Sequence, residues 1–227
     1  MIDPSPEDRE LIIGTMRRWR NGEPVWSHDE ILTRWGREFR MYRAAWAANE
    51  PEHHLPPIGR STALFTLRDE AVSEFGFPIP CRELLDALER YQPIVEIGAG
   101  TGYMTMLMRY RGIDVIGTDA GYGFPKFTVG TYDPMQMRLQ GKTAVRRYRD
   151  RTVFCSWPTL EHTWFRQALR AMRIGQRIIS VEEDACGEQT TWDYRDGTFK
   201  HEATIPLPAW NFMNDRAGVW IKKTKGG

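Results

Sequence analysis

The most constraining feature of this sequence is a run of closely spaced glycines between two short apolar segments. Residues 94–97 read Ile-Val-Glu-Ile, residues 98–102 read Gly-Ala-Gly-Thr-Gly, and a second apolar segment at 113–118 ends at Asp119. Between them, apolar residues recur at helical spacing until Gly112 closes the helix. The pattern predicts a strand, a tight turn, a helix and a second strand, which in an open sheet are parallel and joined by a right-handed crossover.

The glycine loop and the acid that follows it are typical of a nucleoside-binding site. Glycine lets the backbone bend sharply and lets a ligand approach the main chain. An acid at the end of the second strand, here Asp119, can hold both hydroxyls of a ribose. A nicotinamide dinucleotide site shares these parts, but its glycines follow Gly-x-Gly-x-x-Gly, whereas the spacing here is Gly-x-Gly-x-Gly. Glu96 would also repel a pyrophosphate, while a ligand with ammonium and sulfonium groups would be attracted.

At residues 96–102 the chain resembles the class I S-adenosylmethionine-dependent methyltransferases, whose first motif is acid-x-Gly-x-Gly-x-Gly. The resemblance covers about residues 77–223. It implies an α/β fold, a Rossmann-like seven-stranded methyltransferase sheet of order 3-2-1-4-5-7-6 with strand 7 antiparallel. We therefore expect a methyltransferase domain at 77–227, preceded by an N-terminal helical extension at 1–76 that covers the cleft.

The cofactor implied by this resemblance is S-adenosyl-L-methionine. Glu96 and the glycine loop are expected to hold its methionyl part, and Asp119 its ribose. The full set of expected cofactor contacts is Glu96, Gly98, Ala99, Gly100, Thr101, Gly102, Tyr103, Asp119 and Ala120.

The second half of the chain supplies the remaining strands of the expected sheet. Residues 152–156 read as a fourth buried strand and residues 176–181 as a fifth, with an amphipathic helix between them that ends at Gly175. Residues 201–206 and 218–222 are the expected closing antiparallel pair. Methyltransferases have such a pair, and nicotinamide-binding Rossmann domains generally lack it.

A narrower resemblance concerns the acceptor side of the site. The chain is similar to a poorly characterised subgroup of these enzymes, with an aromatic-x-Ile-Pro element before the first motif and a Cys-Trp-Pro-Pro type motif after strand four. Its counterparts here are residues 77–80, Phe-Pro-Ile-Pro, and residues 156–159, Ser-Trp-Pro-Thr. The family places the second element beside the sulfonium, so the expected catalytic residues include Ser156, Trp157 and Pro158. Carboxylates at the end of a strand face the cleft, and the candidate proton acceptors are Glu182, Glu183, Asp184 and His162.

The element after strand four departs from that of methyltransferases acting on the amino groups of adenine, cytosine or glutamine. Those enzymes carry Asn, Asp or Ser, then Pro-Pro and an aromatic residue. Aligned on Pro158, this chain has Trp157 at the polar position and Leu160 at the aromatic one. The third acid of the family, which contacts adenine, is missing from residues 140–145. A small-molecule or protein acceptor is therefore favoured over nucleic acid, although Trp157 could stack on a planar substrate.

The first 76 residues have the pattern of three helices, and a fourth, short helix follows them. Ser5 and the Pro-Glu-Asp that follows it are a helix start, and Asn-Gly at 21–22 is a stop. Residues 27–30, Ser-His-Asp-Glu, are a capping box. A further helix is expected from Thr62 to Phe75, and a short one at 84–91. Behind the capping box, one amphipathic helix is predicted by an aromatic stripe that either packs in the core or lines a substrate pocket: Ile31, Trp35, Phe39, Tyr42 and Trp46.

Composition bounds the remaining classes. Thirty-one basic and thirty acidic residues give a net charge of +1, which does not indicate a global grip on nucleic acid. The basic cluster at 142–151 is either a small anion-docking patch or a solvated loop. No membrane-spanning run and no secretory signal are present, so cytoplasmic localisation is expected. The cysteines lie far apart, which indicates reduced thiols and no metal site: Cys81, Cys155 and Cys186.

Two other functions stay open from the sequence. One is a non-catalytic protein of the same fold that binds S-adenosylmethionine or nothing and acts as a scaffold. The missing third acid and the altered motif after strand four keep that alternative open. The other is a nicotinamide-dependent oxidoreductase, against which the glycine spacing and Glu96 both count.

Overall fold

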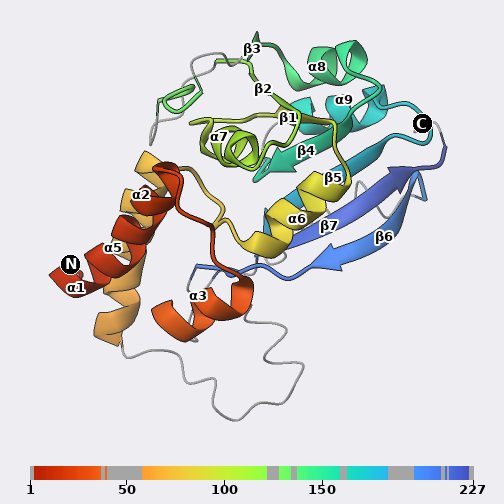
Figure 1. The fold of residues 1–227 in the computed structure, drawn as a ribbon. Coiled ribbons are helices and arrows are strands. Elements are labelled where there is room, and N and C mark those ends of the chain that lie inside the picture. Colours follow the sequence, from red (N-terminus) through yellow and green to blue (C-terminus); the bar gives the residue numbers. More distant parts are fainter. Residues whose placement is uncertain are drawn as a thin grey trace.

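The computed structural model describes residues 3–36, 39, 58–121, 128–133, 137–158, 163–183, 197–210, 213 and 215–224. Its centre is a seven-stranded sheet of order β3-β2-β1-β4-β5-β7-β6 (Figure 1). The strands β1 to β5 pair in parallel, and β7 runs antiparallel to β5 and β6. The predicted fold class, strand order included, is therefore confirmed. The strands are β1 (Ile94–Ile97), β2 (Val115–Asp119), β3 (Met137–Arg138), β4 (Thr152–Ser156), β5 (Arg177–Glu183), β6 (Phe199–Ile205) and β7 (Asp215–Lys222).

Each face of the sheet is covered by its own pair of helices. Buried Ile94 and Phe154 belong to the hydrophobic cluster that includes α6 and α7, whereas Val95 and Val153 belong to the cluster of α8 and α9. Successive residues of a strand point to opposite faces, so Glu96 shares its face with Ile94 and points toward α7. The helices are α6 (Arg82–Arg90), α7 (Tyr103–Tyr110), α8 (Gly141–Arg147) and α9 (Thr163–Ala171). The first residues of the predicted basic loop thus lie on α8.

The N-terminal extension is helical, as predicted. Ser5 caps the first helix by accepting from the Asp8 N–H at 3.0 Å. Ser27 and Glu30 form the predicted capping box in both directions. A π-helical turn between the first two helices has no counterpart in the prediction. The elements are α1 (Pro6–Arg9), the π turn (Glu10–Gly14), α2 (Thr15–Arg20), α3 (His28–Trp35) and α5 (Ile58–Glu74).

The aromatic helix expected behind the capping box is wrong in its length. α3 ends at Trp35, because Gly36 follows with a φ of 116°, a conformation that residues with a side chain rarely adopt. Phe39 lies beyond the helix and is still buried, with its ring 5.4 Å from that of Trp35 and 5.7 Å from that of Trp210. The stripe therefore packs in the core as far as it is described. Its last two members lie outside the described residues.

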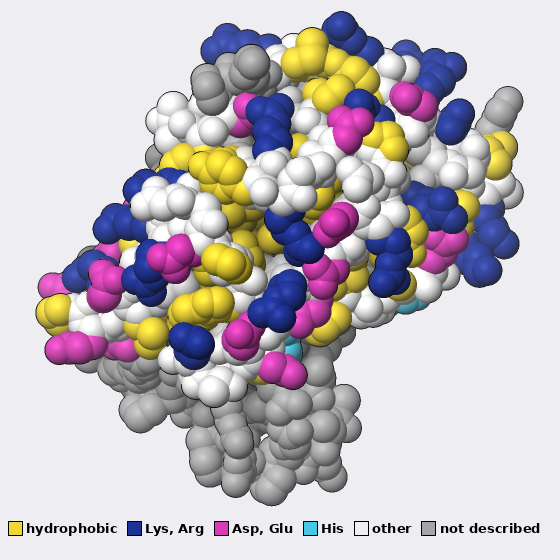
Figure 2. Space-filling model, viewed as in Figure 1, with side chains coloured by type: hydrophobic (Ala, Val, Ile, Leu, Met, Phe, Trp, Pro, Cys, Tyr) yellow, Lys and Arg dark blue, Asp and Glu magenta, His cyan; other side chains and the backbone are white. Residues whose placement is uncertain are grey.

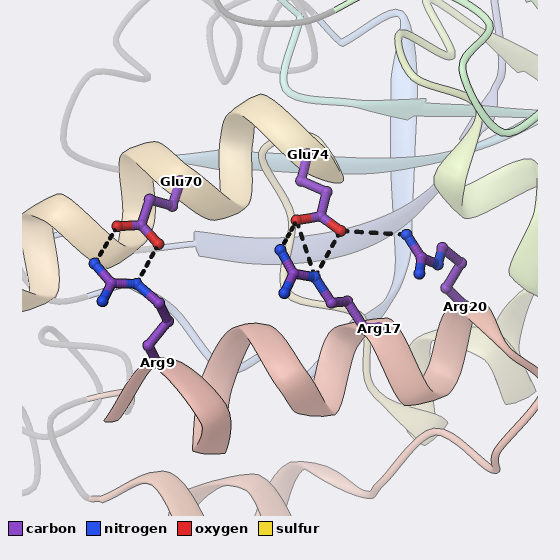
Figure 3. A network of polar contacts seen from close by, with 5 residues as sticks. All are labelled: Arg9, Arg17, Arg20, Glu70 and Glu74. Carbon is purple, nitrogen blue, oxygen red and sulfur yellow. Dashed lines mark hydrogen bonds and ion pairs between the residues drawn. The ribbon is translucent and has the colours of Figure 1, made fainter. Parts of the chain in front are cut away.

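Ion pairs fasten the first helices to α5 (Figure 3). Arg9 pairs with Glu70 at 2.7 Å, and Arg17 and Arg20 both reach Glu74, at 2.7 and 3.3 Å. Exposed pairs of this kind contribute about 1 kcal/mol or less each. They therefore orient the helices more than they stabilise the fold.

The extension and the sheet share one hydrophobic core. Ile12, Met16 and Leu64 of the extension belong to the same buried cluster as Met104 of α7 and Phe154 of β4. Figure 1 shows the N-terminal helices gathered at one end of the sheet, the end toward which the arrow of β4 points. The extension thus lies at the carboxyl end of the parallel strands. A domain boundary at residue 76 stays a prediction.

Candidate functional site

The glycine loop joins β1 to α7 at the carboxyl edge of the sheet. Gly98, Gly100 and Gly102 have φ values of 67°, 55° and 81°. Gly102 is the left-handed N-cap of α7, and a Cβ on it would lie 2.7 Å from the Cβ of Asp133. A side chain is excluded there by conformation and by space. The first turn of α7 contains no acidic residue that would neutralise its positive end, and the Tyr103 N–H donates to the Thr101 hydroxyl at 3.3 Å.

Asp119 fixes the shape of this loop from the end of β2. One carboxylate oxygen accepts from the Gly100 N–H at 3.0 Å, and the other accepts from the Gly121 N–H at 2.8 Å. The residue expected to bind ribose is thus brought against the glycine loop. Each carboxylate oxygen has a further lone pair, so Asp119 can hold the loop and accept from a ligand hydroxyl together. Ala120 lies between Asp119 and Gly121, whose N–H is bound by the Asp119 carboxylate.

Glu96 lies beneath the loop, between β1 and α7. It is 2% exposed, and its carboxyl group accepts a short hydrogen bond from the Thr105 hydroxyl of α7. Burial raises the pKa of Glu96 to about 8; the Thr105 hydrogen bond opposes this rise, and the charges of Asp133 and Asp119 add to it. The predicted attraction for a cationic ligand is therefore exerted from below the loop, and only when the group is ionised.

A second buried acid, Asp133, was missed by the sequence reasoning. It is 1% exposed, and it accepts from the Arg109 guanidinium of α7 at 2.7 Å. A Cβ on Gly117 would lie 2.5 Å from the Thr105 hydroxyl and 3.0 Å from an Asp133 carboxylate oxygen, so β2 passes directly over this group. No periodic pattern marks residues 128–133, and only the fold brings this acid beside the glycine loop.

Two side chains of the predicted cofactor loop turn toward the N-terminal extension. The Thr101 hydroxyl donates to the Phe75 carbonyl at 2.6 Å, and the Tyr103 hydroxyl donates to the Met16 carbonyl at 2.8 Å. The Phe75 and Tyr103 rings lie 4.9 Å apart. Both residues are buried, and their side chains tie the loop to α2 and to the end of α5.

The end of β4 brings together the two elements of the narrower resemblance. Trp157 stacks on Phe77 with ring centres 5.2 Å apart and an interplanar angle of 16°. Its φ is 52°, the one positive value among the described non-glycine residues. Its main-chain N–H donates to the Val181 carbonyl at 2.8 Å. Such a conformation costs about 1–3 kcal/mol. With this backbone conformation, the indole of Trp157 packs against the segment at residues 77–80. The next residue, Pro158, is buried.

Glu182 does not share a face with Ser156. Ser156 is in register with Val181, so the next residue of β5 points to the opposite face. In agreement, the charge of Glu182 is the largest electrostatic contribution that raises the pKa of Cys155, after burial. Glu182 is 5% exposed. Its role as proton acceptor stays a prediction, and His162 and Asp184 lie outside the described residues.

Two absences expected from the sequence concern the described residues only. In the described part of the chain, no group of three or more His, Cys, Asp or Glu side chains is placed to hold a metal ion. Among the helices described, none has the length and apolar character needed to cross a membrane. Cys81 and Cys155 are buried thiols without a disulfide.

Comparison with known proteins finds likeness in structure alone. No protein-family model matches the chain, and no curated protein matches it. A protein of Listeria monocytogenes assigned as an S-adenosylmethionine-dependent methyltransferase is 12% identical, with 61% of this chain and 97% of that one covered and a TM-score of 0.41. The precorrin-6y C5,15-methyltransferase of Geobacter metallireducens is 9% identical, covering 64% and 90%, with a TM-score of 0.41.

A third solved structure is that of the Thermus thermophilus 16S rRNA N2 G1207 methyltransferase in complex with AdoMet and guanosine. It is 14% identical, and 70% of this chain matches 47% of that one with a TM-score of 0.41. At such identities the likeness concerns the fold. The acceptors named for these proteins differ, from a precorrin to a ribosomal RNA.

Proposed function

We propose that this chain binds S-adenosyl-L-methionine at the carboxyl edge of its sheet and transfers the methyl group to an acceptor. The observation that carries the proposal is the joint anchoring of the glycine loop and Asp119. A carboxylate at the end of β2 holds the Gly100 N–H at 3.0 Å, so an acid suited to a ribose adjoins a loop suited to close main-chain approach. The antiparallel β7 between β5 and β6 supports a methyltransferase over a nicotinamide-binding domain.

The residues present fit this cofactor by their chemistry. Asp119 would hold the ribose hydroxyls, and the carboxylate of the methionyl part would lie against the glycine loop at the positive end of α7. Ionised Glu96 would favour the ammonium and sulfonium charges from beneath the loop. When bound, the cofactor supplies an electrophilic methyl group on a positively charged sulfur.

Methyl transfer asks little covalent chemistry of the protein. A lone pair of the acceptor would form the new bond to the methyl carbon while the carbon–sulfur bond breaks. The electron pair of the broken bond would stay on sulfur. An acceptor that carries a proton loses it to a base or to solvent. The chain's own contribution is alignment of the acceptor and exclusion of water. The rigid turn at Trp157 and the N-terminal helices over the carboxyl edge suit both tasks.

The distribution of charged side chains bears on the nature of the acceptor. Figure 2 shows basic and acidic side chains interspersed over the N-terminal helices, which does not favour a large nucleic-acid surface there. The basic residues of α8, such as Arg146 and Arg147, are exposed, but they lie on the helix pair that covers the other face of the sheet from Ser156. We favour a small molecule or a protein side chain.

Isothermal titration calorimetry with S-adenosylhomocysteine tests the cofactor assignment. Asp119→Ala should weaken binding about tenfold to a hundredfold, because one charge-assisted hydrogen bond contributes about 1.5–3 kcal/mol. Asp114→Ala is the matched control, since this exposed aspartate pairs with Arg151 at the other end of β2. No heat with the wild-type chain would contradict cofactor binding. Binding without methyl transfer to any acceptor pool would leave the scaffold alternative.

A further inference from the structure

A cluster of buried hydrogen-bond donors lies at the carboxyl end of β4, where the N-terminal extension meets the sheet. Arg68 of α5 reaches this place, with its guanidinium carbon 5.8 Å from the ring centre of Phe77 and 5.9 Å from that of Trp157. The two rings stack on each other. The guanidinium therefore lies beside both rings of the stacked pair. Side chains of the N-terminal extension and of the sheet domain thus meet at the end of β4.

Arg68 is a poorly compensated cation for its degree of burial. Its side chain is 12% exposed, and its acidic partner among the described residues is the exposed Asp69 of the same helix, at 3.7 Å. That separation exceeds hydrogen-bond distance, and the buried Nε has no partner among the described residues. Cation–π contact contributes about 0.5–2 kcal/mol. It gives the Nε–H no acceptor, and a guanidinium matches a carboxylate or a phosphate in shape.

Two further polar atoms at the same place lack a partner. The indole Nε1 of Trp157 and the hydroxyl of Ser156 are buried, and neither has a hydrogen-bond partner within the described part of the chain. A buried donor without an acceptor costs about 1–3 kcal/mol. Trp157 also holds its strained φ of 52° here. Arginine and indole N–H groups can only donate, and a serine hydroxyl can donate as well, so the cluster is complementary to a group that accepts.

We propose that the methyl acceptor carries an oxyanion, a carboxylate or a phosphate, and that Arg68 binds it together with Trp157 and Ser156 at the end of β4. This inference rests on the proposed methyltransferase function. The oxyanion would fix the acceptor in the position that the fold offers beside the glycine loop, because β4 adjoins β1 in the sheet. The apolar surroundings, Phe77 and Pro158 among them, favour an acceptor with an apolar or planar body. Arg68 is thus a substrate-positioning residue contributed by the N-terminal extension.

The test compares small probes of one size that differ in charge. Benzoate, phenyl phosphate and neutral benzamide are titrated by ligand-observed NMR, with and without saturating S-adenosylhomocysteine. Benzoate or phenyl phosphate should bind at least about tenfold more tightly than benzamide, the worth of a hydrogen bond to a charged group. A preference for one of the two anions tells a carboxylate acceptor from a phosphate acceptor. Equal affinity for benzamide, or no binding of either anion, overturns the proposal without requiring any variant.

Variants then assign the effect to Arg68. Arg68→Met should lose the preference for anions, Arg68→Lys should keep part of it, and Trp157→Phe should weaken it several-fold, because phenylalanine keeps an aromatic ring beside Phe77 but lacks the Nε1 donor. Arg17→Met is the matched control. Arg17 contacts Glu74 of α5, the helix that carries Arg68, and does not contact the ring pair. An Arg68→Met protein that binds benzoate as the wild type does refutes the assignment. Unchanged S-adenosylhomocysteine affinity in Arg68→Met separates this result from a failure of the cofactor assignment, which the wild-type titration alone decides.

Discussion

Replacing Glu96 by glutamine should remove much of the pH dependence of stability between pH 5 and 8. The pKa of Glu96 is raised from 4.5 to about 8, chiefly by burial. Below pH 4.5 the group is protonated in both folded and unfolded chains and costs nothing. Above pH 4.5 the unfolded chain ionises first, so the folded chain loses stability as pH rises toward 8. At about 1.4 kcal/mol per pH unit, the loss between pH 5 and 8 is about 4 kcal/mol as an upper limit.

The assay is urea unfolding of the wild type and Glu96→Gln at a series of pH values. Glutamine keeps the size of the side chain and can still accept from the Thr105 hydroxyl, so Glu96→Gln should gain on the wild type steadily as pH rises. Glu89→Gln, which changes an exposed glutamate paired with Arg111, is the control. If the wild type and Glu96→Gln lose the same stability over this range, Glu96 is not protonated in the folded state and the reasoning fails. A second consequence concerns the ligand: S-adenosylmethionine favours the ionised carboxylate, so its binding at pH 7 should release protons, measurable by calorimetry in buffers of different ionisation enthalpy.

Two further predictions concern the packing of the loop. Gly102→Ala should destabilise the protein by several kcal/mol, because a positive φ and the contact with Asp133 both oppose a Cβ. Gly112 is the control, since it has a similar φ of 75° and a Cβ added there would have nothing within 4 Å. Gly112→Ala should therefore lower the free energy of unfolding in urea by only about 1–2 kcal/mol. Equal losses would show that the space beside Gly102 is not limiting. Tyr103→Phe removes the hydrogen bond to the Met16 carbonyl and should cost about 1–2 kcal/mol, with faster amide exchange at residues 98–103; unaltered exchange would show that the extension does not hold the loop.

The sequence predicted the sheet well because its strands are short, apolar and separated by strong signals. The glycine loop, the acid at 119 and the closing antiparallel pair lie in local patterns that the structure confirms. The antiparallel pair extends further than predicted, from Phe199 to Ile205 and from Asp215 to Lys222. The first two residues of β7, Asp215 and Arg216, are charged, so an apolar pattern does not mark them as part of a strand although Asp215 is buried.

The length of α3 was predicted wrongly because a stripe of apolar residues was weighed above a single glycine. Gly36 stands within the predicted helix and takes a φ of 116°, and the aromatic side chain of Phe39 reaches the core without helical geometry. Periodicity shows which residues are buried more reliably than it shows where a helix ends. The burial of Ile31, Trp35 and Phe39 was accordingly right, and the helix that was to carry all three was not.

The contacts that shape the candidate site lie between segments far apart in the chain, so the sequence could not give them. Asp133 meets Arg109 across 24 positions, and Arg68 meets Trp157 only because α5 packs at the end of β4. Glu96 was expected to act on the ligand through its charge. Its raised pKa follows from burial and from neighbouring carboxylates, which become apparent only once β1, β2 and the loop at residues 128–133 are assembled.

Hydrogen–deuterium exchange with S-adenosylhomocysteine and with NAD tests the central assignment most directly. If the carboxyl edge of the sheet is a site for S-adenosylmethionine, S-adenosylhomocysteine should slow the exchange of the amides at residues 98–103 and 119–121. NAD at the same concentration should leave the exchange of these amides unchanged. Protection of those amides by NAD alone, or by neither ligand, would contradict it.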